Sequence, residues 1–517
     1  MPGTLLLGVD IGTSSAKGVL CTPDGEVLVT KIVAHETSFP RPGWAEHDPE
    51  AIWWGEFVQI TRAILAEGYT GDDIGGVAVS AIGPCMLPLD AAGNPLRNGI
   101  LYGIDSRAGE EIAWLEERHG ADAMFALNGM SLTSQAIGPK IRWFREHEPE
   151  AFARTAMIHS ASDYMVFRLT GEHVIDRHSA SYFIPLFDVR TLDWDDRFAD
   201  GVIGLDRLPR LLDANEIAGT VSVAAAAETG LKAGTPVTAG TIDAAAEAVS
   251  VGVARPGDMM VMYGSTLFLI DLVAEPHPDR RMWTAAYALP GVHAVTGSIT
   301  SSGLLTAWFR DTLGGEEVRD ERAGGPNAYA ALAALADAVP PGADGLVCLP
   351  YFAGERTPLN DPDARGAFVG LTLRHTRAHL YRAVLEAIGY GLRMNLDVMA
   401  EMAARPDRLV AVGGGAQNRT WLQIVSDITG MAQVLPARTV GASFGDALMA
   451  GMATGIVNPD TAFARWVRTA DVIEPNPANS ATYDEAYAIF QSLYPSLKHD
   501  LHRLGRLATS GRDLTVR

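Results

Sequence analysis

Short runs of apolar residues, separated by turns and by amphipathic segments, extend along most of the chain. Residues 4–10, 16–21 and 26–34 are each dominated by apolar side chains, and residues 75–82 form another such run. These runs predict buried strands. The segment that begins at residues 48–50 (Asp-Pro-Glu) predicts a helix rich in aromatic side chains. Strands that alternate with helices in this way are typical of an α/β fold.

One pattern occurs twice in the chain. Residues 5–20 and 259–270 both consist of an apolar run, a turn that contains Gly-Thr or Gly-Ser-Thr, and a second apolar run. Two strand–turn–strand units about 250 residues apart predict two domains that are built on one plan and face each other. Any two hairpins share this pattern, so the repeat by itself leaves a chance likeness open.

The domain boundary is placed near residue 250, because residues 231–240 close the first half and residues 254–260 open the second. The predicted division is a first domain over 1–250, a second over 251–495 and a locally basic tail over 496–517 whose end frays. Residues 316–325 are charged and glycine-rich, which predicts a mobile loop.

Composition limits the classes of protein to which the chain can belong. Its 517 residues are 47% hydrophobic and 20% charged, typical of a soluble globular protein with two or three domains. The formal net charge of −21 argues against a nucleic-acid partner, because phosphate neutralisation needs clustered Lys and Arg. A bound anion would therefore be held by backbone N–H groups, a helix N-terminus or a metal ion.

The cysteines and the apolar runs bear on location. Cys21, Cys85 and Cys348 have no metal-ligand or disulfide spacing, which favours a reducing compartment. The first residues lack a basic segment followed by a long apolar stretch, and no run of about 18 apolar residues occurs, so we expect neither a signal peptide nor a membrane partner. We expect a cytoplasmic protein.

The first candidate site is the turn after the first predicted strand. Gly12 allows a close approach to an anion, and the backbone N–H groups with the hydroxyls of Thr13 and Ser14 can cradle a phosphate. Asp10 can hold Mg²⁺, and Lys17 adds a positive charge. The alternative is an ordinary hairpin turn with a capping aspartate. A second turn of this kind, Gly264-Ser265-Thr266, favours the phosphate-binding interpretation.

A third glycine-rich segment lies within residues 410–430, where a strand ends at Gly413-Gly414-Gly415 and a helix begins near Asn418. Bare backbone at Gly414 and Gly415 suits a flat base or ribose, and Asn418 could hydrogen-bond to it. The alternative is a strand-to-helix turn that needs glycine only for packing. The segment is not a Rossmann fingerprint, which argues against a dinucleotide cofactor.

Asp243 lies where a predicted strand meets a predicted helix within residues 235–252. An aspartate there can cap the helix. It can also act as a general base that accepts the proton of a substrate hydroxyl. The following residues are alanines, so we expect no competing salt bridge close to Asp243.

Together these segments resemble the FGGY family of carbohydrate kinases. The matching stretches are 10–13 (DIGT), 42–54 (PGWAEHDPEAIWW), 169–172 (LTGE), 229–243 (TGLKAGTPVTAGTID), 350–371, 366–386 and 413–418 (GGGAQN). Residues 366–386 fit the family's C-terminal signature, including Gly370, His379, Ala383 and Glu386. The resemblance covers residues 4–495.

The resemblance implies two actin-like ATPase (ribonuclease H-like) α/β domains that face a central cleft. It implies phosphoryl transfer from MgATP to a primary hydroxyl of an open-chain sugar or polyol, with Asp243 as base and Asp10 at Mg²⁺. The turns at 12–14 and 264–266 would bind phosphates, and Gly414, Gly415 and Asn418 would lie at the adenosine. It leaves a homodimer open.

The substrate side departs from the family's xylulokinase pattern. Where xylulokinases carry Met-His, this chain has Gly83-Pro84, and only Asp105 and Arg107 remain of a Trp-Asn-Asp-x-Arg motif. We expect Gly83, Pro84, Asp105 and Asp243 to border the substrate, in a wider and less polar pocket. D-xylulose is the single substrate favoured, while residues 179–195 lean toward gluconokinases.

Other substrates and two other classes stay open. Within the family these substrates are gluconate, other aldonates, polyols and tetruloses. Outside enzymes, the chain could be an ATP-dependent sugar sensor or a chaperone-like ATPase on the same fold. Retention of both Asp243 and the turn at residues 10–13 argues against these two.

Overall fold

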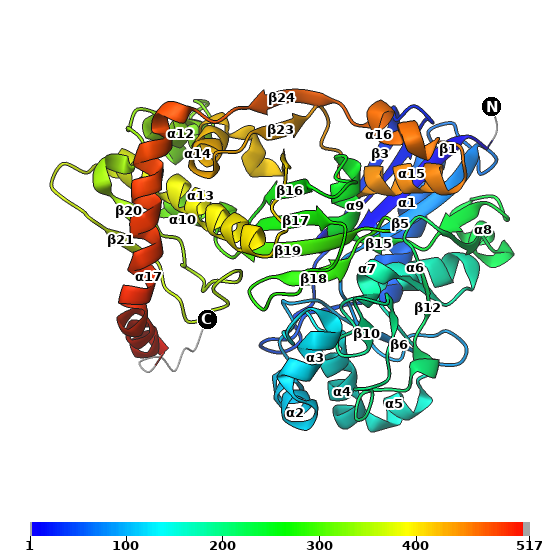
Figure 1. Ribbon diagram of the computed structural model, residues 1–517. Coiled ribbons are helices and arrows are strands. Elements are labelled where there is room, and N and C mark those ends of the chain that lie inside the picture. The colour runs from blue at the N-terminus through cyan, green and yellow to red at the C-terminus, as the bar shows by residue number, and fades with distance from the viewer. Residues whose placement is uncertain (1–2, 510–517) are drawn as a thin grey trace. The chain divides into compact units, whose positions relative to one another are not determined.

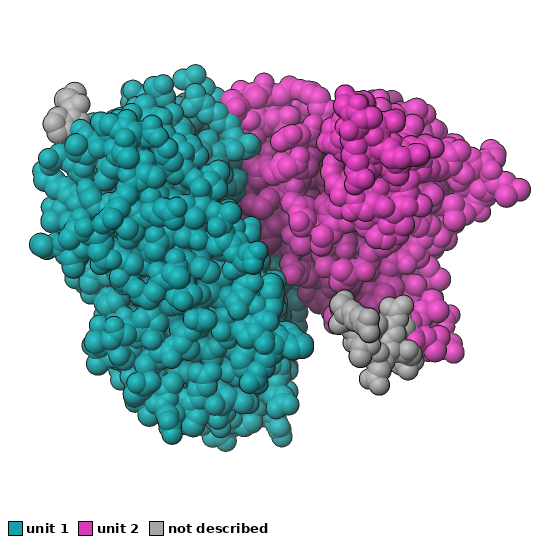
Figure 2. All heavy atoms as spheres, turned by 180° about the vertical axis from the view of Figure 1, so that it is seen from behind, with its two compact units in different colours: residues 1–256, 272–294, 438–468 teal, residues 257–271, 295–437, 469–517 magenta. Residues whose placement is uncertain are grey.

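The computed structural model describes residues 3–509 of the chain. The chain divides into two compact units, each made of segments that are not contiguous in sequence (Figure 2). Unit 1 comprises residues up to Pro256, Leu272–Ala294 and Arg438–Arg468; unit 2 comprises Gly257–Asp271, Val295–Ala437 and the residues from Thr469 onward. A single boundary near residue 250 would not have separated Arg438–Arg468 from the segments around it.

Unit 1 is built on a seven-stranded sheet of order β13-β14-β5-β1-β2-β3, in which β15 also pairs with β5 (Figure 1). The strands are β1 (Leu5–Ile11), β2 (Ser15–Cys21), β3 (Val27–Ala34), β5 (Ile74–Ala81), β13 (Ile217–Thr220), β14 (Pro236–Thr238) and β15 (Thr241–Ile242). The strands predicted at 4–10, 16–21, 26–34 and 75–82 are therefore confirmed. Because β1 and β15 both run parallel to β5, their carboxyl ends lie at one edge of the sheet.

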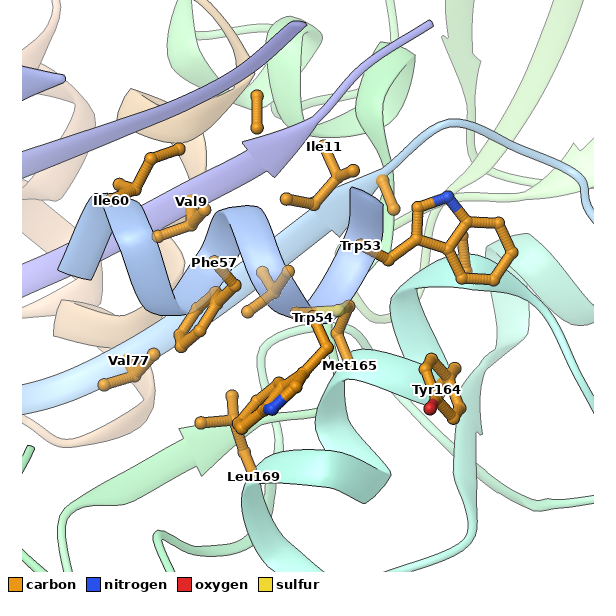
Figure 3. Close-up of a cluster of buried hydrophobic side chains, with 14 of the residues drawn as sticks. Val9, Ile11, Trp53, Trp54, Phe57, Ile60, Val77, Tyr164, Met165 and Leu169 are labelled. Atoms are coloured by element: carbon orange, nitrogen blue, oxygen red, sulfur yellow. The ribbon is translucent and has the colours of Figure 1, made fainter. Parts of the chain in front are cut away.

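One face of this sheet is covered by the aromatic helical segment that the sequence predicts. Asp48 caps its first turn by accepting from the Glu50 and Ala51 N–H groups, and the segment continues as η1 (Pro49–Trp54) and α1 (Gly55–Leu65). Figure 3 shows the apolar cluster between this segment, the sheet and α6 (Ala161–Thr170): Val9, Ile11, Trp53, Trp54, Phe57, Ile60, Val77, Tyr164, Met165 and Leu169. These side chains are buried, and they fix the ends of β1 and β5.

The other face is covered by a helix from far along the chain. Helix α15 (Ala442–Ala453) packs on β1, β5 and α9 (Asp243–Ser250). The approach is close because glycines line it: a Cβ on Gly8 would lie 1.9 Å from the Ser443 carbonyl oxygen, and one on Gly445 would lie 2.0 Å from the Ala246 carbonyl oxygen. Small residues therefore bring α15 against the sheet, with α16 (Pro459–Trp466) after it.

The rest of unit 1 consists of short elements, most of them between β5 and β13. They are β4 (Glu46–His47), β6 (Leu87–Leu89), β7 (Gly99–Ile100), α2 (Gly109–His119), α3 (Ala121–Asn128), α4 (Ile137–His147), α5 (Pro149–Arg154), β8 (Met157–His159), β9 (Val174–Asp176), α7 (Arg177–Ala180), β10 (Phe187–Asp188), β11 (Asp193–Trp194), β12 (Arg210–Leu212) and α8 (Val223–Thr229). Many of their apolar side chains form a second buried cluster, around Trp143, Phe144 and Phe183.

The second seven-stranded sheet has the order β18-β19-β17-β16-β22-β23-β24. Its strands are β16 (Asp258–Tyr263), β17 (Leu267–Val273), β18 (Trp283–Ala286), β19 (His293–Ile299), β22 (Arg408–Val412), β23 (Gln433–Pro436) and β24 (Thr469–Ile473). Of these strands, β18 belongs to unit 1. The helices and remaining strands of unit 2 include α10 (Gly303–Leu313), α12 (Ala328–Asp337), β20 (Val347–Leu349), β21 (Ala367–Val369), α13 (Arg377–Glu401), α14 (Arg419–Thr429) and α17 (Ser480–Thr509). Both β1–β2 and β16–β17 are antiparallel hairpins, as the repeated pattern predicts.

Two segments differ from the sequence prediction. The prediction of a mobile loop at 316–325 is wrong for the first part of that segment, which belongs to helix α11 (Gly315–Arg322). Glu316 and Glu317 stand in the first turn of that helix, where carboxylates stabilise the helix dipole, and both pair with Arg377. Residues 496–509, expected to begin a tail, continue α17, and residues 510–517 lie outside the described part.

Candidate active site

Three strands and a helix of unit 1 bring polar groups together at one edge of the first sheet. In the register, Asp10 of β1 lies beside Ser80 of β5, and Ser80 lies beside Thr241 of β15. Asp243 follows two residues later, as the first residue of α9, and its Oδ1 accepts from the Ala244 N–H at 2.7 Å. The prediction that Asp243 lies where a strand meets a helix is confirmed.

Ser80 links two aspartates in this group. Its hydroxyl donates to Oδ2 of Asp446 at 2.7 Å and lies 3.4 Å from Oδ1 of Asp10, while its N–H donates to Oδ2 of Asp446 at 3.1 Å. Asp446, on α15, is fully buried, and its Oδ1 has no hydrogen-bond partner within the described part of the chain.

Burial and mutual repulsion raise the pKa values of these carboxyl groups. Burial is the largest cause that raises the pKa of Asp10 well above its usual value, and the charges of Asp243, Asp446 and Glu247 raise it further while Lys17 lowers it. Burial likewise raises the pKa of Asp243 to about 7. The charge of Glu247 adds to this rise, and the hydrogen bond from the Ala244 N–H opposes it. A carboxyl group with a pKa near the working pH is suited to general-base catalysis.

Glu247 is a charged neighbour of Asp243 that the run of alanines after Asp243 did not reveal. It stands one helical turn later on α9, and its charge raises the pKa of Asp243, while Lys17 opposes the burial effect on Glu247 itself. The Lys17 ammonium also donates to the carbonyl oxygen of Val440 at 2.9 Å. The positive charge expected from Lys17 therefore lies between Glu247 and the backbone before α15.

In unit 2, the turn Gly264-Ser265-Thr266 joins β16 to β17 and is held by the start of α10. The Gly303 N–H donates to the Gly264 carbonyl oxygen at 2.9 Å, and the Leu304 N–H donates to the Ser265 carbonyl oxygen at 3.0 Å. A Cβ on Gly303 would lie 2.5 Å from the Gly264 oxygen, so glycine permits this approach.

The glycine-rich segment after β22 lies beside the same turn. A Cβ on Gly413 would lie 2.8 Å from the carbonyl oxygen of Tyr263, the residue that precedes Gly264. Gly414 has open space at its Cβ position, whereas a Cβ on Gly415 would lie 2.7 Å from the Trp421 ring. Asn418 caps α14, because its side-chain oxygen accepts from the Trp421 N–H at 3.1 Å.

The family models decide what these two units belong to. The model described as the FGGY family of carbohydrate kinases, N-terminal domain, matches residues 5–250, and the model for the C-terminal domain matches residues 259–454. The chain is an FGGY carbohydrate kinase. The predicted family and the α/β fold class with two sheet-containing, actin-like ATPase domains are thereby confirmed.

Curated relatives and solved structures agree with this assignment. The kinase is 30% identical to the xylulose kinase of Escherichia coli K12, over 95% of its own chain and 99% of that protein. It is 28% identical to a gluconokinase of Bacillus subtilis 168, over 94% and 95%. The solved xylulose kinase of Rhodospirillum rubrum superposes with a TM-score of 0.90 at 33% identity, covering 96% of the kinase and 100% of that chain.

On the substrate side, the residues expected at the sugar have different surroundings. A Cβ on Gly83 would lie 2.6 Å from Cγ1 of Ile242, so an apolar side chain, rather than open space, borders Gly83. Asp105 is fully buried and its oxygens accept from the Ala45 N–H at 2.7 Å and from the Arg107 guanidinium. Asp105 therefore orients Arg107.

Arg107 and Lys140 are candidate substrate residues that the sequence analysis did not select. Arg107 pairs with Glu46 at 2.9 Å and lies 3.9 Å from the ring of Trp44, and its Nη1 is buried without a partner among the described residues. Lys140 donates to the Leu101 carbonyl oxygen at 2.6 Å, and burial lowers its pKa to about 8. A lysine in the otherwise apolar inner face of α4 was the available signal.

No group of three or more His, Cys, Asp or Glu side chains within residues 3–509 is placed to hold a metal ion. A single aspartate such as Asp10 still fits Mg²⁺, which keeps several waters and binds with one or two carboxylates and substrate phosphates. Among the described helices, none has both the length and the apolar character needed to cross a membrane.

Proposed function

We propose that this kinase transfers the γ-phosphoryl group of MgATP to a primary hydroxyl of an open-chain sugar, and that D-xylulose is the first candidate substrate. The observation that carries the mechanism is the half-buried Asp243, whose pKa is raised to about 7, at the same sheet edge as Asp10. The names of the relatives, xylulose kinases and gluconokinases, support the substrate class.

In this proposal Asp243 accepts the proton of the attacking hydroxyl. Asp10 would hold Mg²⁺, which neutralises phosphate charge when bound. The N–H groups of the turn at Gly12-Thr13-Ser14 and of the turn at 264–266 would bind phosphate oxygens, and Gly414, Gly415 and Asn418 would border the adenosine. Positioning and charge stabilisation then supply most of the acceleration.

Gluconate, other aldonates, polyols and tetruloses stay as alternative substrates, because Ile242 beside Gly83 offers a sugar hydroxyl no polar partner. The non-enzyme alternatives, a sugar sensor and a chaperone-like ATPase, are disfavoured by the family assignment and by the retained Asp10 and Asp243. A cytoplasmic location and a homodimer stay predictions from sequence.

The test is a screen of ADP release with MgATP and D-xylulose, L-xylulose, D-ribulose, erythrulose, erythritol or D-gluconate. We expect one substrate to give turnover that depends on Mg²⁺, and discrimination against the others of about tenfold to a few hundredfold. A preference for D-xylulose above a thousandfold would show that the Gly83-Pro84 region does not relax specificity. No turnover with any substrate would contradict the proposed reaction.

A further inference from the structure

Three consecutive carbonyl groups of the first phosphate turn accept hydrogen bonds from one short segment. His35 Nε2 lies 3.2 Å from the carbonyl oxygen of Gly12, and the Thr37 hydroxyl donates to the carbonyl oxygen of Thr13 at 2.9 Å. The backbone N–H of His35 donates to the carbonyl oxygen of Ser14 at 2.9 Å. The segment that follows β3 thus holds the whole turn from its carbonyl side.

His35 is held in turn by a buried carboxylate. Its Nδ1 lies 2.8 Å from Oε2 of Glu56 on α1, and the two side chains are only 5% and 9% exposed. Both ring nitrogens therefore face acceptor oxygens. The His35 ring is therefore fixed between Glu56 and the carbonyl oxygen of Gly12.

Thr37 belongs to a second series of hydrogen bonds, whose donor-to-acceptor direction is set by Trp53 at the other end. The Trp53 indole N–H donates to Nδ1 of His47 at 3.2 Å, and Nε2 of His47 lies 3.1 Å from the Thr37 hydroxyl. Burial, with a smaller contribution from the nearby His35, lowers the pKa of His47 to about 4, so His47 is neutral at pH 7. Because its Nδ1 accepts, its proton is on Nε2 and points at Thr37.

These two series of hydrogen bonds set the orientation of the N–H groups that a phosphate would meet. In a trans peptide the carbonyl and the N–H of one unit point in opposite directions. Fixing the carbonyls of Gly12 and Thr13 toward residues 35–37 therefore aims the N–H groups of Thr13 and Ser14 away from them. Neither N–H donates to a protein acceptor within residues 3–509.

We propose that His35 and Thr37 are positioning residues that aim the Thr13 and Ser14 N–H groups at a nucleotide phosphate, with Glu56 and His47 holding them in place. This rests on the proposed function of the turn as a phosphate site. Pre-oriented donors of this kind cost no reorganisation when the anion arrives.

The test compares the dissociation constants of ATP and adenosine, measured by calorimetry without sugar. Thr37→Val keeps the shape and removes the hydroxyl, whereas Thr37→Ser keeps the hydroxyl. We expect Thr37→Val to weaken ATP binding about tenfold while adenosine binding is unchanged, and Thr37→Ser to resemble the wild type. Thr61→Val, at a buried hydroxyl elsewhere on α1, is the control and should change neither constant.

A second set of variants tests His35 independently of Thr37. His35→Gln leaves an amide that cannot donate to both Glu56 and Gly12, and we expect about tenfold weaker ATP binding. The double variant His35→Gln/Glu56→Gln restores a donor for each acceptor without charge, so it should recover part of that loss. This set also decides the matter if Thr37→Val does not fold, as a thermal melt would reveal.

Other outcomes overturn the inference or the function separately. If the wild type binds adenosine and ATP equally, the turn is not a phosphate site and the proposed function of these residues fails. If the wild type prefers ATP but Thr37→Val and His35→Gln bind it normally, the positioning role is wrong. Equal losses for ATP and adenosine would also contradict it, because they indicate a general structural effect.

Discussion

Asp243 shows how one residue acquires a chemical property from its surroundings. Its sequence position at the start of a helix explains its bond to the Ala244 N–H, which lowers its pKa, whereas burial and Glu247 raise the pKa to about 7. Activity that depends on the carboxylate should therefore fall as the pH drops below about 7. Profiles of kcat/KM between pH 5 and 9 measure this.

Asp243→Asn should abolish most sugar phosphorylation, because general-base catalysis contributes about 10²–10⁴-fold.

The stability of Asp243→Asn should change in the opposite direction. A carboxyl group whose pKa is higher in the folded than in the unfolded state stabilises the fold at pH values below its unfolded-state pKa. That contribution is lost as the pH rises through the folded-state pKa of about 7. We therefore expect Asp243→Asn to be more stable than the wild type at pH 8, with the difference shrinking toward pH 4. Urea unfolding at pH 8 and pH 4 tests the stability prediction. For the activity prediction, a loss of kcat below tenfold would rule Asp243 out as the base.

Asp446 is the second residue whose role depends on its neighbours. Asp446→Ala would leave the buried N–H and hydroxyl of Ser80 without their acceptor, at a cost of about 1–3 kcal/mol. Asp446→Asn keeps an oxygen for Ser80 and should retain the stability. Chemical denaturation of the two variants measures the difference, and equal stability would show that the Ser80 contact contributes little.

At the scale of elements, the active-site edge depends on α15 lying against β1. Gly8 permits this contact, since a Cβ there would lie 1.9 Å from the backbone oxygen of Ser443. Neither backbone can move aside without separating the helix from the strand. The position of Asp446 relative to Asp10 therefore depends on a glycine in the middle of a buried strand.

Gly8→Ala should destabilise the protein by about 3 kcal/mol or more, at the upper end for overpacking of a core. The measurement is the free energy of unfolding in urea. Gly109→Ala is the matched control, because Gly109 begins α2 and has nothing within 4 Å of its Cβ position. That control should be neutral or slightly stabilising. A Gly8→Ala protein as stable as the control would show that α15 can shift at little cost.

At the scale of the whole molecule, the family assignment predicts which cofactor stabilises the native state. MgATP should raise the melting temperature, since a ligand that binds only the native state stabilises it by mass action. NAD should give no shift, because the glycine-rich segment at 413–418 is not a dinucleotide fingerprint. Thermal melts with saturating MgATP, ATP with EDTA, and NAD test this. A shift with NAD but not with MgATP would overturn the nucleotide assignment.

The sequence by itself determined the local structure and most of the chemistry that local structure carries. Apolar periodicity predicted β1, β2, β3 and β5, and the turns at 12–14 and 264–266 and the junction at Asp243 followed from neighbouring residues. These features depend on interactions within a few residues, so the pattern of side chains is enough to identify them.

Only the tertiary structure decided which groups meet. Ser80 and Asp446 lie 366 positions apart in the chain, and Lys17 and Val440 lie 423 apart. His35, Thr37 and the turn at Gly12 meet because β1, β2 and β3 pair in one register and α1 packs beside them. Strand register and helix packing depend on the whole core, so no local pattern indicates that Asp446 would lie near Asp10 or that His35 would lie beside the turn at Gly12.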